Sequence, residues 1–170
     1  IGFMMKKIKK TVCFVSTRVL FCALKTLCRY DSRMRAAFAS YPAGYVFRLN
    51  AGMEKDDARL TFRTTQDGGL EKIGDEAAAD LEITMKSTSE AFNVFTGIAG
   101  IAQTYAAHGF YVKGNPYETM GLVRGLELAE AYLFPKILTR RILTRVPSKK
   151  CSVATVYAGI VCALVKGSLQ

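Results

Sequence analysis

The 170-residue sequence lacks tryptophan, contains a single histidine, and has only five cysteines. No two cysteines form a CxxC pair, their number is odd, and His108 is distant from all of them in the sequence. These absences argue against a zinc-binding motif and against a complete disulfide framework. We therefore interpret the cysteines as reduced thiols of a cytoplasmic protein, at apolar packing positions on helices.

Catalytic patterns are also missing from the sequence. It contains no P-loop, no dinucleotide-binding fingerprint and no GxSxG elbow. His108 has no partner nearby in sequence for general-base chemistry, which favours a helix-end role. Asp56, Asp57, Asp75 and Glu76 fall in expected turns, where solvated charge is the default. We predict a protein that is not an enzyme and that has no cofactor and no metal site.

Acidic residues are scarce at both ends of the chain. Residues 1–50 hold ten Lys and Arg and one acidic residue, whereas residues 131–170 hold seven basic residues and none that are acidic. Residues 51–130 carry a net charge of −6 within the total of +10. Basic ends of this kind indicate an anionic partner, for which a phospholipid surface is favoured over nucleic acid.

Residues 4–29 begin like a signal peptide, but Arg18 and Lys25 interrupt the apolar part and no small-residue cleavage site follows. Apolar residues recur instead at near-helical spacing, which predicts a basic amphipathic helix. Its predicted stripe is Ile8, Val12, Val15, Val19, Cys22 and Leu27. Docking of this stripe on the rest of the protein is favoured, and contact with an anionic membrane is the alternative.

Alternating patterns predict the strands. Residues 45–51 and 58–65 alternate apolar and polar side chains and are expected to form an antiparallel pair with one wet face. Residues 81–85 show the same pattern, and residues 110–114 form a short apolar strand. Residues 70–79 are weakly patterned and are expected to form a short strand and a loop.

Capping residues mark the helices. Asp31 caps a short helix, and Ser87 with Glu90 fits a capping box before a helix that Gly97 ends. A second apolar helix is expected over residues 98–107, with Gly109 in the left-handed conformation at its end. A third is expected from Pro116 to about Leu133, because an asparagine N-cap precedes the proline.

The strand ADLEI at residues 79–83, the helix pair at residues 87–107 and the strand GFYVKG at residues 109–114 occur in an order that resembles the sterol-carrier-protein type 2 (SCP-2) domain. The resemblance covers roughly residues 40–134. It implies an α+β, SCP-2-like fold with a five-stranded, mostly antiparallel or mixed sheet, covered on one face by helices, and an apolar tunnel for a lipid. The last residues, Gly-Ser-Leu-Gln, differ from the peroxisomal tripeptide that family members often carry.

The resemblance divides the chain into basic amphipathic helices at residues 1–39, the SCP-2-like domain at residues 40–134, and a C-terminal helical extension at residues 135–170. The extension begins with a basic stretch that repeats ILTR, for which a solvated face is favoured over contact with anionic lipid. Its uncharged run at residues 151–165 is shorter than the ~18 residues that span a bilayer. A buried docking helix is therefore favoured over a shallow membrane insertion.

The resemblance implies non-catalytic binding, for transfer or sensing, of a lipid, a sterol-like molecule or an acyl chain. The basic ends are expected to allow peripheral contact with anionic membranes. For Arg124 we consider a surface pair with Glu127 or a sheet carboxylate, and alternatively contact with a lipid head group. A structural or regulatory module with a filled core, whose basic ends bind an anionic macromolecule or a membrane, is the competing hypothesis. The expected pocket residues are Phe47, Leu49, Phe62, Ile83, Met85, Phe92, Phe95, Ile101, Tyr105, Phe110, Val112, Met120 and Val123.

Overall fold

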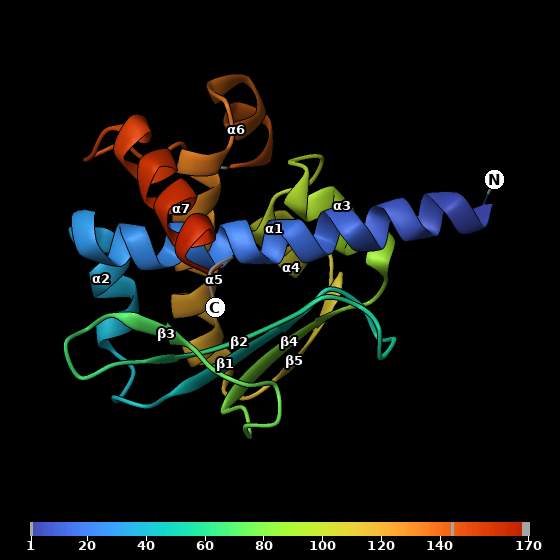
Figure 1. Ribbon diagram of the computed structural model, residues 1–170, viewed down its shortest axis with the longest axis horizontal. Helices are drawn as coiled ribbons and strands as arrows, with labels where there is room; N and C mark the ends of the chain where they lie inside the picture. Colours follow the sequence, from blue (N-terminus) through green and yellow to red (C-terminus); the bar gives the residue numbers. More distant parts are fainter. Residues whose placement is uncertain (1, 144, 168–170) are drawn as a thin grey trace.

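A five-stranded sheet forms the base of the molecule, and the helices lie over one face of it in the computed structural model, which describes residues 2–143 and 145–167 (Figure 1). The strands are β1 (Val46–Asn50), β2 (Arg59–Thr64), β3 (Leu70–Lys72), β4 (Leu81–Met85) and β5 (Phe110–Lys113). The helices are α1 (Gly2–Tyr30), α2 (Ser32–Ala39), α3 (Thr88–Phe95), α4 (Ile101–Ala106), α5 (Pro116–Leu133), α6 (Lys136–Ile142) and α7 (Val153–Gly167). The α+β class and the extra terminal helices are as expected.

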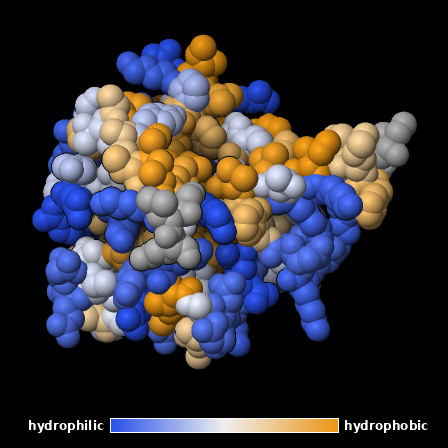
Figure 2. Space-filling view, in the orientation of Figure 1, coloured by the Kyte–Doolittle hydropathy of each residue, from blue (hydrophilic) through white to orange (hydrophobic). Residues whose placement is uncertain are grey.

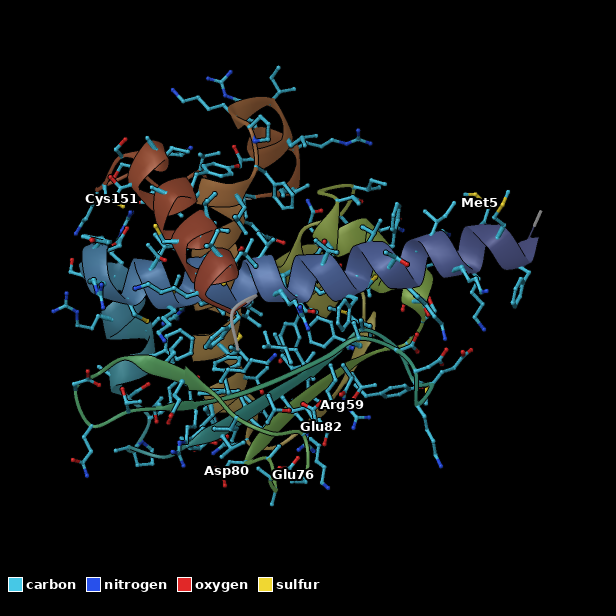
Figure 3. All side chains as sticks on the ribbon, in the orientation of Figure 1. Met5, Arg59, Glu76, Asp80, Glu82 and Cys151 are labelled. Carbon is cyan, nitrogen blue, oxygen red and sulfur yellow. The ribbon has the colours of Figure 1, made fainter. Side chains whose placement is uncertain are left out.

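The sheet has the strand order β3-β2-β1-β4-β5. Only β1 and β4 are parallel, with Phe47 opposite Leu81 and Leu49 opposite Ile83, and the other neighbours are antiparallel. Because side chains alternate along a strand, these four residues face the helices, and polar residues face away. Figure 3 shows Arg59 and Glu82 on the uncovered face of the sheet. The predicted mixed sheet with one wet face is confirmed.

The helix caps agree with the sequence, with two corrections. The side chains of Asp31, Ser87 and Asn115 each accept a hydrogen bond from the first turn of the helix that follows. The second helix of the predicted pair begins at Ile101 and not at residue 98, because the amides of residues 98 and 99 both donate to the carbonyl of Asn93. At its end His108, and not Gly109, takes the left-handed conformation, with φ of 55°.

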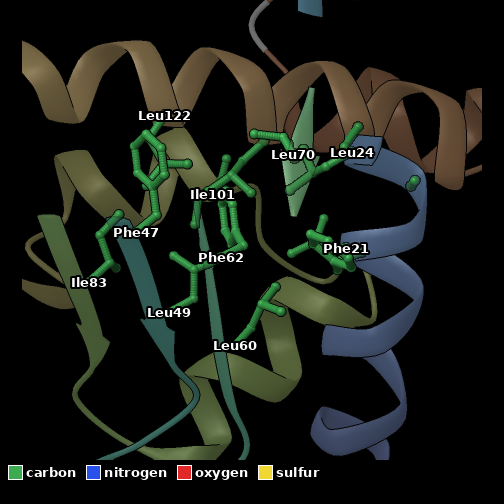
Figure 4. Close-up of a cluster of buried hydrophobic side chains, with 14 of the residues drawn as sticks. Phe21, Leu24, Phe47, Leu49, Leu60, Phe62, Leu70, Ile83, Ile101 and Leu122 are labelled. Atoms are coloured by element: carbon green, nitrogen blue, oxygen red, sulfur yellow. The ribbon is translucent and has the colours of Figure 1, made fainter. Parts of the chain in front are cut away.

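An aromatic cluster fills the space between the sheet and α2. Figure 4 shows Phe47 and Phe62 of this cluster among other buried hydrophobic side chains. Phe47 is fully buried and stacks on Phe62 with ring centroids 5.1 Å apart. Phe38 of α2 and Tyr41 meet the Phe47 ring edge-on at 5.5 and 4.8 Å. Such contacts add to the burial of apolar area, so this part of the core is filled by its own side chains.

Helix α1 crosses the helical layer, but its buried face differs from the predicted stripe (Figure 1). Ile8 and Val15 of that stripe are exposed, whereas Val19 is half-buried and Cys22 and Leu27 are buried. The N-terminal half packs on one side only, while α7 covers the second half from above and buries nearly its whole circumference. The buried residues of α1 are Cys13, Thr17, Leu20, Phe21, Cys22, Ala23, Leu24, Leu27 and Cys28.

The apolar run of residues 151–165 forms most of α7, which packs mainly on α1 and buries Val156 and Ile160. All five cysteines are free, and Cys13, Cys22 and Cys28 are buried, but Cys162 is exposed on α7 and therefore does not occupy the predicted packing position. Thr144 of the ILTR repeat and the last three residues of the chain lie outside the described residues.

A buried carboxylate ties the C-terminal extension to the rest of the protein. Asp31 accepts hydrogen bonds from the Arg33 guanidinium at 2.7 Å and from the Tyr132 hydroxyl at 2.9 Å, and that hydroxyl also accepts from the amide of Lys150. Burial alone would raise the pKa of Asp31, but the donors outweigh this effect and lower the pKa to about 2. The carboxylate therefore joins α2, α5 and the segment before α7.

Gly159 of α7 packs closely against Thr26 of α1. A Cβ atom at this position would lie 2.6 Å from Cγ2 of Thr26, and the Thr26 hydroxyl donates to the carbonyl of Cys22 at 2.8 Å, which restricts its rotamer. We expect Gly159→Ala to lower the free energy of unfolding by about 1–3 kcal/mol in a denaturant titration. Gly167→Ala is the control, because a Cβ there meets nothing within 4 Å. Equal stability of the two variants would contradict this close packing.

Candidate functional site

A partly open apolar cavity with a volume of about 210 Å³ lies between the inner face of the sheet and the helices above it. It lies beside the aromatic cluster, because Leu49 of its lining follows Phe47 by two residues on β1. Strands β1 and β4 form its floor, and α1, α3, α5 and α7 contribute to its walls. The lining residues are Ser16, Val19, Leu20, Leu49, Asn50, Ala51, Ile83, Met85, Val94, Phe95, Ile101, Leu126, Glu130, Leu133, Phe134 and Tyr157.

The sequence pattern explains why these residues meet. Leu49, Ile83 and Met85 alternate with polar residues on their strands, so they point toward the helices. On α5, Leu126, Glu130 and Leu133 follow one another at helical spacing and form one stripe. The cavity therefore has an apolar floor and, in its wall, one carboxyl group.

Glu130 is the polar feature of this wall that the sequence analysis missed. Its side chain is 95 % buried, since its residual exposure is 5 %. Oε1 accepts a hydrogen bond from the backbone amide of Ile101 at 3.0 Å, at the start of α4. Oε2 is buried and has no hydrogen-bond partner among the described residues. A buried carboxyl oxygen without a partner is unfavourable when the group is ionised.

Burial raises the pKa of Glu130 from 4.5 to about 8, and the nearby charge of Glu127 adds to the increase, whereas the Ile101 amide lowers it. Glu130 is therefore mostly protonated at neutral pH. Because the folded-state pKa is the higher one, the folded protein binds more protons than the unfolded chain between about pH 4.5 and about pH 8. The contribution of Glu130 to stability is present below this window and is lost as the pH rises through it.

Replacing Glu130 with glutamine removes this titration and keeps an oxygen acceptor for the Ile101 amide. We expect Glu130→Gln to gain stability over the wild type as the pH rises, on the order of 3 kcal/mol between about pH 5 and about pH 9. Urea unfolding at the two pH values measures the difference. Glu127→Gln, which changes a half-buried carboxyl group one turn earlier, serves as the control. Parallel pH profiles for wild type and Glu130→Gln would contradict the buried, protonated state.

The structure distributes the predicted pocket residues over four places. The cavity is lined by Leu49, Ile83, Met85, Phe95 and Ile101. Phe47, Phe62 and Val123 lie in the filled core instead, because a step of two residues along a strand moves a side chain by about 7 Å, which separates the hollow section from the aromatic cluster.

Two other predicted pocket residues lie near the surface. Met120 is 40 % exposed on α5. Phe92 is half-buried on α3, and its ring lies under the ammonium group of Lys9 at 5.7 Å. The apolar stripe of α3 turns Val94 and Phe95 toward the cavity, which leaves Phe92 at the border with α1.

Tyr105, Phe110 and Val112 line a separate open depression with a volume of about 370 Å³ at the β5 edge of the sheet. The rings of Tyr105 and Phe110 stack with centroids 5.5 Å apart. His108 and Lys86 also line this depression, and the Lys86 ammonium lies 5.3 Å from the Tyr111 ring centroid. The depression is thus more polar than the cavity. Tyr105, Phe110 and Val112 therefore do not line the cavity with the other predicted pocket residues.

The predicted head-group contact of Arg124 is not supported by the geometry. Arg124 is exposed on α5 and is not among the residues that line either hollow. At 3.6 residues per turn, Arg124 and Glu130 point about 120° apart around the helix axis, so Arg124 faces away from the stripe that reaches the cavity. The negative charge closest to Arg124 in sequence is Glu127, whose pKa Arg124 lowers against a larger increase from burial.

Three carboxylates, those of Glu54, Asp56 and Asp57, gather in the loop between β1 and β2. The ammonium of Lys10 lies 2.7, 2.6 and 3.4 Å from them, and Lys6 reaches Glu54 at 2.6 Å. Two cations of α1 therefore offset most of the negative charge of these three carboxylates. Part of the basic N-terminal charge, which was expected to contact an external anionic partner, thus forms ion pairs within the molecule.

The opposite side of α1 remains uncovered along its first half. Apolar side chains there include Phe3, Ile8 and Phe14, and the cations Lys7 and Arg18 lie over the Phe3 and Phe14 rings. Figure 2 shows hydrophobic residues along this end of the helix, whereas the sheet side is mostly hydrophilic, and Figure 3 places Met5 at the projecting end.

By length and composition, α1 is the one helix in the described part of the chain that could cross a membrane, with a mean hydropathy of 1.5 in its most apolar 18-residue window. Within the molecule, 56 % of that window is buried. The buried part of that window packs within the molecule, because α1 contacts the sheet, α3 and α7.

Comparison with solved structures finds SCP2 domains. A protein described as "UbiJ-SCP2 Ubiquinone synthesis protein" is 16 % identical, with 68 % of this chain and 96 % of that chain covered and a TM-score of 0.48. For sterol carrier protein 2 from Yarrowia lipolytica, in its apo form, the identity is 19 %, the coverage 66 % and 92 %, and the TM-score 0.40. Palmitated SCP2L2 from Aedes aegypti is 14 % identical, with 60 % of this chain and 91 % of that chain covered and a TM-score of 0.36.

No protein-family model matches the chain, and no curated protein matches it. The strand order and the one-sided helical layer agree with the α+β, SCP-2-like architecture that the sequence resemblance implied. All three TM-scores lie below 0.5, so the similarities do not identify a ligand for this chain.

Proposed function

We propose that the protein binds a lipid without catalysis, with the apolar part of the lipid in the cavity between the sheet and the helices. The observation that carries the proposal is the cavity itself, which has a mostly apolar lining and lies beside the packed aromatic cluster. Transfer of a hydrocarbon chain from water into such a site is favourable by about 0.8 kcal/mol for each buried methylene group.

The size of the cavity favours a slender chain. Its volume of about 210 Å³ exceeds the ~150 Å³ of an apolar cavity that admits benzene, but lies below the ~300 Å³ at which pockets for drug-sized molecules begin. A single acyl chain therefore fits the space better than a rigid fused-ring system. Of the ligands expected from the sequence, the cavity size therefore favours an acyl chain over a sterol-like molecule.

Native mass spectrometry of the protein purified from cells tests this proposal. A carrier is expected to retain a bound lipid, visible as an added mass that disappears after delipidation and returns on incubation with a fatty acyl compound. The competing hypothesis of a structural or regulatory module with a filled core predicts the mass of the polypeptide alone in all three samples, and that result would overturn lipid binding.

The uncovered face of α1 supports a peripheral contact with anionic membrane from the cytoplasmic side. Phe3, Phe14 and Val15 are exposed, and Lys7 and Arg18 stand beside them, which is the pattern of a helix that lies in the headgroup region. The fraction of protein that sediments with phosphatidylglycerol vesicles is expected to fall for Phe14→Ser. It should stay unchanged for Ser40→Ala, a change at the C-cap of α2. Equal sedimentation of Phe14→Ser and wild type would exclude this surface.

A further inference from the structure

Glu130 is the only carboxyl-bearing residue in the cavity lining among the described residues, and no lysine or arginine lines the cavity. Its Oε1 atom is held by the Ile101 amide at 3.0 Å, whereas Oε2 is buried and unpaired. Glu130 lines the cavity, and a rotation about its broad terminal torsion is needed to turn Oε2 toward a bound molecule. The wall thus offers one polar atom to a bound molecule.

We propose that Glu130 is the polar anchor of the cavity, and that it donates a hydrogen bond from Oε2 to an uncharged acceptor oxygen of the lipid. The ligand class that follows is a single-chain lipid with a carbonyl or hydroxyl head group, and not an ionised fatty acid. This inference rests on the proposed function, since it specifies the ligand of the same cavity.

The hydrogen-bond geometry decides which oxygen carries the proton. Oε1 accepts from an N–H group, so the proton of the neutral carboxyl group belongs on Oε2. A carbonyl or hydroxyl oxygen can accept that proton, and the buried oxygen then gains the partner it lacks. Binding of such a head group removes an unfavourable feature of the empty cavity.

Charge explains why an ionised head group is disfavoured. A carboxylate brought beside Glu130 would leave water without meeting a cation, because the cavity lining holds none. The titratable groups that face Glu130 are Glu127, one turn earlier on α5, and Tyr157 of α7, whose hydroxyl donates to the carbonyl of Leu133 at 2.8 Å. The lining residues of α1, α3, α4, β1 and β4 are uncharged.

Calorimetric titration with compounds of one chain length tests the anchor: dodecan-2-one, laurate and dodecane, each added to the full chain. At about pH 7 we expect the wild type to bind the ketone about tenfold more tightly than laurate. The preference for the ketone over dodecane is expected to fall about tenfold in Glu130→Met and to persist in Glu127→Met, which changes a carboxyl group outside the cavity lining.

The pH profile provides a second readout that does not depend on Glu130→Met folding well. Affinity of the wild type for the ketone is expected to decline above about pH 8, where Glu130 loses its proton, whereas Glu130→Gln, which donates at every pH, should show no decline. Tighter binding of laurate than of the ketone, or parallel pH profiles, overturns the anchor and leaves the proposed function standing. No binding of any of the three compounds overturns both.

Discussion

Replacing Phe47 with alanine is expected to lower the free energy of unfolding by about 3–5 kcal/mol, because the change empties the centre of the aromatic cluster. Phe47 has no exposed surface, stacks on Phe62 and contacts the rings of Phe38, Tyr41 and Tyr45. Domains are stable by only about 5–15 kcal/mol, so the loss is a large part of the total. Denaturant unfolding followed by circular dichroism measures it.

Phe14→Ala is the matched control for Phe47→Ala, since the Phe14 side chain is 50 % exposed on α1. Its replacement is expected to change the free energy of unfolding by no more than about 0.5 kcal/mol. A similar loss in the two variants would show that Phe47 is not part of a filled core. It would also restore Phe47 as a candidate for the lining of a ligand site.

Replacing Ala51 with phenylalanine is expected to abolish binding of acyl compounds. Ala51 lines the cavity at the end of β1 and is 2 % exposed. Since an apolar cavity of ~150 Å³ accommodates one benzene ring, a phenyl group at this position occupies most of the available 210 Å³. Displacement of a fluorescent acyl probe measures the effect, and we expect at least a hundredfold weaker binding, or about 2.7 kcal/mol.

The control for Ala51→Phe is Ala36→Phe, which adds the same ring at an exposed position of α2. It should bind the probe like the wild type. Both variants are compared at equal fraction folded, so that a loss of binding in Ala51→Phe reports the filled cavity and not unfolding. Retained binding in Ala51→Phe would show that the ligand site lies elsewhere.

The helix starts and the inward-facing strand residues could be predicted, because capping residues and strand alternation are local features of the sequence. Asp31, Ser87 and Asn115 cap their helices through side-chain oxygens that accept from the next turn, and the alternation of β1, β2 and β4 fixes which side chains face the helices. The start of α4 could not be predicted, because the bonds from residues 98 and 99 to the Asn93 carbonyl compete with a helix over the same apolar residues.

The buried face of α1 could not be predicted from periodicity, because the helix has apolar residues on two sides. One side is covered by α3 and the sheet, while the other is covered by α7 only along the second half of the helix. The helix α7 comes from the far end of the chain, so no local pattern shows which residues of α1 it covers. Helical periodicity placed Ile8 and Val15 in the predicted buried stripe, but both are exposed.

The floor of the cavity could be predicted, but its polar wall was missed. Leu49, Ile83 and Met85 follow from strand alternation. The sequence does contain a feature that marks Glu130. It stands four residues after Leu126 and three before Leu133, so a carboxyl group interrupts an apolar stripe at helical spacing. Arg124 lies off this stripe and is exposed. Where the core is hollow depends on packing, which a single sequence does not reveal.

The most direct test of the account locates the ligand in the protein. Nuclear Overhauser contacts can be measured between a ¹³C-labelled acyl compound and the methyl groups of the wild-type protein. We expect contacts with the methyl groups of Ile83, Met85 and Ile101 around the cavity, and none with Leu60 in the filled core. Contacts confined to exposed residues of α1, such as Ile8 and Val15, would contradict a lipid site between the sheet and the helices.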